Sequence, residues 1–119
     1  MSRLFGRYSV LAIAGNARIF FFQQPIDMRK GVESLSLLVE QSCIGELTTG
    51  AYFVFINRLG DRMKVLYWDN DGFAIWWKRL EKGSFRLLGV DKALIDRREF
   101  FMLLEGITPH KIQKRFRIT

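Results

Sequence analysis

The chain has 119 residues, and its length, composition and charge exclude several classes of protein before any motif is considered. A chain of this size forms one compact domain, and 11 Phe, 3 Trp and 3 Tyr supply ample apolar surface for a core. The single cysteine, Cys43, can form neither an intramolecular disulfide nor a zinc site of several thiolates, which favours a reducing cytoplasm. Apolar runs such as 19–22 are far shorter than the roughly 20 residues that cross a bilayer, so no membrane span is expected.

Positive charge exceeds negative charge and is spread unevenly along the chain. There are 19 Lys and Arg against 12 Asp and Glu, which gives a formal net charge of +7. The excess lies in residues 1–26, 57–86 and 106–119. Such a surplus favours a polyanionic partner, since each neutralised phosphate releases condensed counterions. A basic surface that only maintains solubility explains the charge alone equally well.

The first half of the chain predicts a lead-in, a strand and a helix. Residues 1–17 show no sustained hydrophobic period and form an irregular lead-in or a weak strand. The β-branched and aromatic run 18–22 stops before Pro25, which is typical of a strand. Apolar residues at spacings of three and four then predict a helix over about 28–42, with Asp27 as its N-cap. The apolar stripe of this helix consists of Val32, Leu35, Leu38 and Val39.

The second half predicts an antiparallel meander followed by a second helix. Four β-rich runs are separated by short turns that contain glycine, which is typical of consecutive hairpins. These runs are 52–56, 63–68, 73–80 and 84–88. After Asp91, apolar residues at helical spacing from Leu94 to Leu104 predict a helix that ends at Gly106. The expected fold class is α+β, with an antiparallel meander of about four to five strands and two helices packed against it. The chain is expected to form a single domain, in which residues 18–107 are the core and residues 108–119 a basic tail.

The segment 69–72 resembles the start of a calcium loop, because Asp69 and Asp71 alternate before a glycine. The rest of that loop is missing, since Leu80 stands where its closing glutamate would fall. Asn, Asp and Gly are also the residue types that hairpin turns with positive φ require. A turn is therefore the better explanation, and no metal site is predicted.

Catalytic chemistry has little support in the remaining acids or in the single histidine. Paired carboxylates could serve two-metal phosphoryl transfer, but Asp27 is explained by a helix cap and Asp61 by a turn. His110 lies in the basic tail, with no acid, serine or thiol placed by sequence to make it a catalytic base. We expect a protein that is not an enzyme and has no cofactor.

Basic and aromatic residues alternate over 62–79 and form the most informative surface candidate. Strand alternation places Arg62 and Lys64 on one face, with large rings close by on the next strand. Such a face can hold phosphates or stack on bases, although a Trp-rich core with cationic ends explains the same pattern. The candidate nucleic-acid residues here are Arg58, Arg62, Lys64, Lys78, Arg79 and Lys82.

Two further groups of cations complete the candidate set. Arg29 and Lys30 fall at the expected helix start, where the helix dipole disfavours cations, so an external anion or partner would explain them better. The tail could bind the phosphate backbone of a nucleic acid without sequence preference, or it could be a solvated or partner-binding terminus. Its cations are Lys111, Lys114, Arg115 and Arg117.

Three strings of residues carry a family resemblance when they are taken in order and spacing. They are Asp27-Met28-Arg29-Lys30-Gly31 with Leu35; Phe53-Val54-Phe55 through Asn57-Arg58-Leu59-Gly60-Asp61-Arg62 to Lys64; and Trp68-Asp69 with Gly72-Phe73, Lys78-Arg79-Leu80-Glu81-Lys82-Gly83 and Phe85. Over about 18–107 the chain resembles the TnpB-type accessory protein, the second-reading-frame product, of the bacterial insertion sequence sixty-six family. It departs from that family at Leu59, where a second basic residue beside Arg58 is common, and this weakens the case for a phosphate-binding turn there.

The resemblance implies a small accessory protein that acts beside a separate, larger transposase and carries no catalytic activity of its own. We expect it to contact DNA at the element ends, the transposase, or both. The alternative is a pure protein-interaction module that docks on the transposase without touching DNA. No membrane or small-molecule substrate is expected among the partners.

Overall fold

The computed structural model describes residue 13 and residues 15–85 and 94–105. Within these residues the chain forms five strands and two helices. In order they are β1 (Ile19–Phe21), α1 (Val32–Ser42), β2 (Tyr52–Ile56), β3 (Arg62–Trp68), β4 (Phe73–Arg79), β5 (Leu94–Ile95) and α2 (Arg97–Leu104). The strands form one sheet in the order β4-β3-β2-β1-β5. The predicted α+β class is confirmed.

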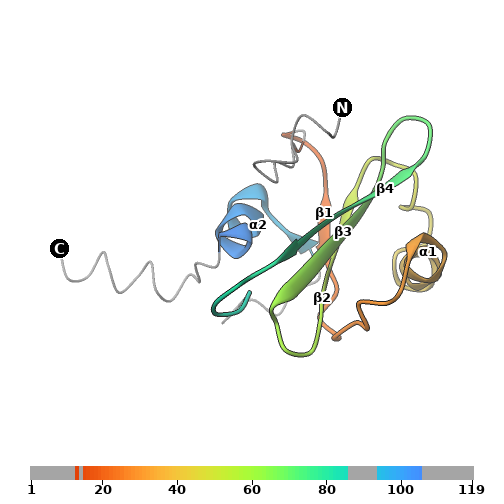
Figure 1. Ribbon diagram of the computed structural model, residues 1–119. Coiled ribbons are helices and arrows are strands. Elements are labelled where there is room, and N and C mark those ends of the chain that lie inside the picture. The colour runs from red at the N-terminus through yellow and green to blue at the C-terminus, as the bar shows by residue number, and fades with distance from the viewer. Residues whose placement is uncertain (1–12, 14, 86–93, 106–119) are drawn as a thin grey trace.

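The two helices lie on opposite sides of the sheet, so the molecule has three layers (Figure 1). On the α1 side, Leu35 and Val39 pack among apolar side chains of the sheet that include Phe53. On the α2 side, Phe100 and Leu103 belong to the other buried cluster. Alternation along β2 and β3 supplies both clusters, because successive side chains of a strand point to opposite faces.

The predicted meander is confirmed for β2, β3 and β4, which pair antiparallel with one another. The first of their two connections is held by Asn57, whose side chain binds the Arg62 N–H at 3.0 Å and the Asp61 carboxylate at 2.8 Å. Gly60 in this turn has φ 79°, and a Cβ there would lie 3.1 Å from Ser84 Cβ. This combination of positive φ and close approach requires glycine.

The second connection is the turn at 69–72, where the Asp69 N–H donates to the Gly72 carbonyl at 2.7 Å and Asn70 has φ 60°. The interpretation of this segment as a hairpin turn is confirmed.

The expected start of the first helix is wrong. α1 begins at Val32 with Gly31 as its N-cap, and no side chain caps it. Asp27 lies in the preceding turn, where its carboxylate accepts from the Arg29 backbone N–H at 2.9 Å and from the Arg29 guanidinium. An aspartate that binds the N–H two residues further on stabilises a turn in competition with a helix.

Three other expectations near the ends of the sheet also need correction. Leu94 and Ile95 are not helical; they form β5, which pairs antiparallel with β1, while α2 begins at Arg97. β1 pairs parallel with β2, so the complete sheet is mixed. Residues 84–85 of the fourth expected run lie outside any strand, and residues 86–88 fall outside the described residues, as do most of the lead-in and the whole tail.

Candidate nucleic-acid interface

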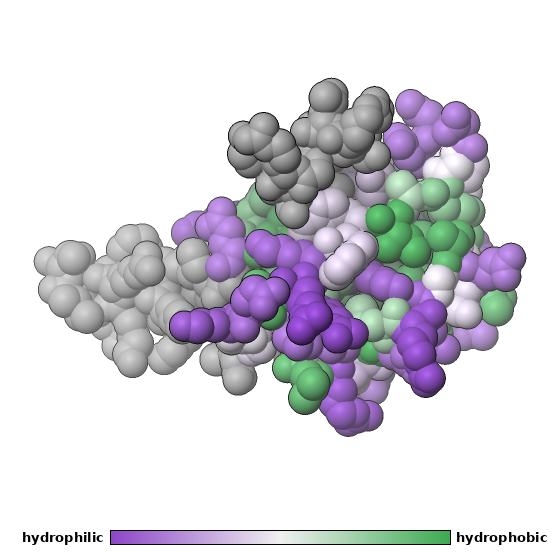
Figure 2. All heavy atoms as spheres, in the orientation of Figure 1, coloured by the Kyte–Doolittle hydropathy of each residue, from purple (hydrophilic) through white to green (hydrophobic). Residues whose placement is uncertain are grey.

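The α1 side of the β3–β4 ladder carries the clearest candidate site. Arg62 lies directly opposite Arg79, and Lys64 directly opposite Trp77. Because paired residues share a face, these four side chains project to the same side of the sheet. They border a hollow of about 430 Å³, whose lining is Met28, Arg62, Met63, Lys64, Ile75, Trp77 and Arg79. In Figure 2 strongly hydrophilic side chains gather over the middle of the visible face.

The Arg62–Arg79 pair has no counter-ion in the described part of the chain. The two ion pairs found there are Arg18–Glu46 and Arg29–Asp27, and neither involves this site. Both guanidinium groups of the Arg62–Arg79 pair are exposed and make no hydrogen bond to a described residue. Like charges directly opposite each other destabilise a sheet. An external anion bound between them would remove this repulsion.

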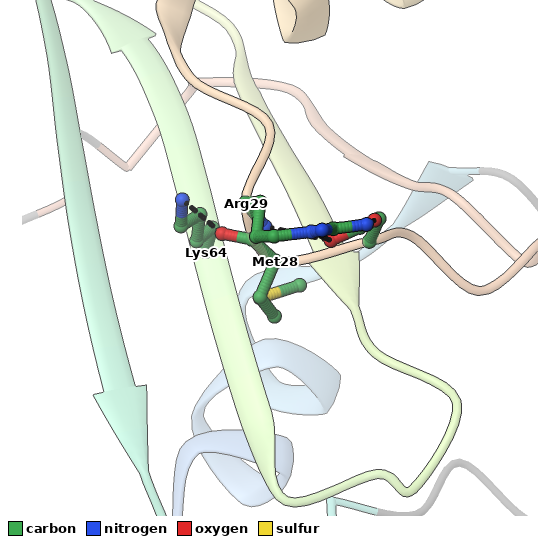
Figure 3. Close-up of polar contacts among 4 residues, drawn as sticks. Met28, Arg29 and Lys64 are labelled. Atoms are coloured by element: carbon green, nitrogen blue, oxygen red, sulfur yellow. Dashed lines mark hydrogen bonds and ion pairs between the residues drawn. The ribbon is translucent and has the colours of Figure 1, made fainter.

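Lys64 joins the site to the segment that precedes α1. Its ammonium donates to the Met28 carbonyl at 2.7 Å (Figure 3). It also donates to the Lys30 carbonyl at 2.9 Å. Carbonyl oxygens do not neutralise the ammonium, so its positive charge still acts on the hollow, while two of its three donors are already used. Trp77 also lines the hollow, and this residue is 61% exposed.

The structure separates the other predicted cations of the sheet from this hollow. Lys78 follows Trp77 on β4 and therefore points to the α2 side, where it donates to the Leu104 carbonyl at 3.0 Å. Arg58 is exposed in the β2–β3 turn and lines a different hollow, of about 310 Å³, beside Leu59. Lys82 is exposed beyond the end of β4.

Arg29 and Lys30 are not part of a helix, so the argument from the helix dipole does not apply to them. The Arg29 guanidinium binds Asp27, with Nη2 to Oδ2 at 2.7 Å. These hydrogen bonds hold the pKa of Asp27 well below its usual value and raise the pKa of Arg29. Much of the Arg29 charge is therefore balanced locally, whereas Lys30 is exposed. The four tail cations lie outside the described residues.

Comparison with known proteins gives the family of the chain. A family model described as "IS66 Orf2 like protein" matches residues 17–114. This chain belongs to the IS66 Orf2-like family. The match confirms the resemblance found in the sequence and extends beyond 107 to include Lys111 and Lys114 of the tail. Membership indicates an accessory role in the transposition of an insertion sequence.

Two curated relatives of this IS66 Orf2-like protein come from Sinorhizobium fredii (strain NBRC 101917 / NGR234). The uncharacterized protein y4jC is 33% identical over 100 residues, which cover 82% of this chain and 86% of the relative. The uncharacterized protein y4hO is 36% identical over 70 residues, which cover 59% of this chain and 61% of the relative. No solved structure matches the chain.

Three further observations on the IS66 Orf2-like protein concern metal ligands, its cysteine and its helices. Its described His, Cys, Asp and Glu residues form no group of three or more that could hold a metal ion. Burial, and to a lesser extent Glu46, raises the pKa of the Cys43 thiol, which disfavours a reactive thiolate. No helix among the residues placed by the structure has the length and apolar composition needed to cross a membrane.

Met28 and Ile75 line the hollow, but the sequence does not predict either of them as a site residue. No local signal marks Met28, which lies in a turn. For Ile75 a signal was present, since strand alternation places it on the same face as Trp77.

Proposed function

We propose that this IS66 Orf2-like protein supports transposition by contacting the phosphate backbone of DNA through the Arg62–Arg79 pair. The observation that carries the proposal is the pairing of two exposed guanidinium groups directly across the ladder with no acid to balance them in the described residues. A phosphate oxygen accepts well from arginine, whose planar donors can bind two oxygens at once.

The surroundings of the pair suit a nucleic acid better than a small anion. The hollow is open beside the exposed Trp77 ring, which can stack on a base or cover a sugar. The Lys64 ammonium adds positive charge to the same face. Arg58 and Lys82 project from the adjoining turns and could extend contact along a backbone.

The test is a fluorescence-anisotropy titration of the full chain with duplex element-end DNA and a scrambled duplex over a range of salt concentrations. Arg62→Gln should weaken binding and make the slope of log affinity against log salt less negative by about one. Arg29→Gln is the matched control, since Arg29 is already paired with Asp27, and it should change the slope less. Equal losses in the two variants, or no loss in Arg62→Gln, would overturn the assignment.

A second candidate function, docking on the transposase without DNA contact, is favoured by exposed apolar side chains at α1. Leu37 on α1 is 64% exposed, and Ile44 just beyond the helix is 82% exposed. An apolar interface tolerates salt, whereas phosphate contacts do not. A salt-resistant complex with purified transposase, together with no binding to DNA at low salt, would support this alternative.

A further inference from the structure

β4 is an edge strand whose outer side is unpaired within the described residues. Hydrogen bonds from the Asp69 N–H to the Gly72 carbonyl and from the Leu80 N–H to the Asp61 carbonyl fix the phase of the β3–β4 ladder. Alternate residues of β4 therefore bond to β3, and those between them direct their N–H and C=O groups outward. The outward set consists of Phe73, Ile75, Trp77 and Arg79.

This edge has the properties of a pairing surface. It spans seven residues, Phe73–Arg79, without proline or glycine, and its exposed Trp77 lies beside the open backbone groups. The edge strands of native proteins are usually short, bulged, charged or covered, because a long open edge can pair with a strand of another chain. Only Lys78 and Arg79, at one end, provide charge along the strand.

The charges at the two ends of β4 have opposite signs. Asp69 and Asp71 are exposed in the turn that precedes the strand. At the other end Arg79 is exposed, and the following residues contribute Glu81 and Lys82, which balance each other. A strand with this polarity is complementary to a second copy of itself in antiparallel orientation, because each acidic end then meets a cationic end.

We propose that two copies of this chain associate through β4, joined antiparallel about a two-fold axis near Trp76. In this register Ile75 lies opposite the second copy's Trp77, and Phe73 opposite the second copy's Arg79. All four outward-directed residues are then paired. Asp71 becomes a diagonal neighbour of the second copy's Arg79, within reach of its long side chain. The interface is isologous, so this charge contact forms twice.

The association goes beyond the proposed DNA contact and does not depend on it. Directly paired residues share a face, so both α1 helices lie on one side of a continuous ten-stranded sheet. The two copies of Arg79 then lie six residues apart along the pairing, a separation of roughly 20 Å at the usual strand rise. Arg62, one strand in from the edge, remains accessible in each copy.

The experiment is sedimentation equilibrium of the full chain, without DNA, over a wide concentration range. The wild type should reach twice the mass of the 14.0 kDa chain. Asp71→Lys and Arg79→Glu each place like charges at both ends of the interface, so each should weaken association roughly tenfold or more. An equimolar mixture of the two variants restores opposite charges at both ends and should associate as well as the wild type.

Two further variants keep the assignment specific. Trp77→Pro removes an outward-directed N–H and the exposed indole but no hydrogen bond to β3, so it should stay folded by circular dichroism and remain monomeric. Arg62→Gln, which tests DNA contact, should associate normally. A wild type that is monomeric at every concentration, or a dimer unaffected by both charge reversals, would overturn the proposal, as would failure of the mixture to associate.

Discussion

Lys64 has a structural role in addition to its charge. Its ammonium ties β3 to the turn before α1 through the carbonyls of Met28 and Lys30, at 2.7 and 2.9 Å. Lys64→Met keeps the aliphatic stem but leaves both carbonyls without this charged donor. We expect the free energy of unfolding to fall by about 1–3 kcal/mol, the usual effect of losing hydrogen bonds to a charged group. Urea unfolding followed by tryptophan fluorescence measures it.

Lys82→Met is the control for this substitution, because Lys82 is exposed and makes no hydrogen bond or ion pair with a described residue. It should change the free energy of unfolding by less than about 0.5 kcal/mol. Both variants lose one positive charge, so the comparison separates the hydrogen bonds from the net charge. If the two proteins unfold at the same urea concentration, Lys64 does not hold the turn against the sheet.

Among the elements, α2 depends on a reciprocal cap at its first turn. The Asp96 carboxylate accepts from the Glu99 N–H at 2.7 Å, and the Glu99 side chain accepts from the Asp96 N–H at 2.9 Å. Asp96→Ala should lower the free energy of unfolding by about 1 kcal/mol, whereas Asp96→Asn keeps an acceptor and should lose much less. Urea denaturation monitored by circular dichroism compares them, and equal losses would show that the cap is not the cause.

The elements that could be predicted are those determined by neighbouring residues. β2, β3 and β4 follow one another through short turns, and each corresponds to one continuous β-rich run in the sequence. β5 could not be predicted, because Ile95 pairs with Ile19 far away in the sequence and its apolar spacing continues that of α2. The parallel pairing of β1 with β2 is non-local in the same way, since α1 lies between them.

The candidate site was predictable in its residue types but not in its geometry. Alternation correctly placed Arg62 and Lys64 on one face of β3. The partners of these side chains depend on the register with β4, which puts Arg79 opposite Arg62 and sends Lys78 to the other side of the sheet. The pairing of Arg29 with Asp27 likewise depended on where α1 begins.

At the scale of the whole molecule, a net charge of +7 by itself attracts a polyanion, and a site on the sheet must be distinguished from that general attraction. Two variants with equal net charge make the distinction, because each replaces four cations by glutamine. The sheet variant changes Arg58, Arg62, Arg79 and Lys82. The tail variant changes Lys111, Lys114, Arg115 and Arg117.

We expect the sheet variant to lose more affinity for duplex DNA and to show the flatter dependence on salt. Arg62 and Arg79 converge on one face with Lys64 beside them, so a phosphate placed there interacts with several charges at once. The measurement is the same anisotropy titration over a range of salt concentrations. Equal losses in the two variants would mean that net charge alone drives binding, and a larger loss in the tail variant would move the DNA contact away from the sheet.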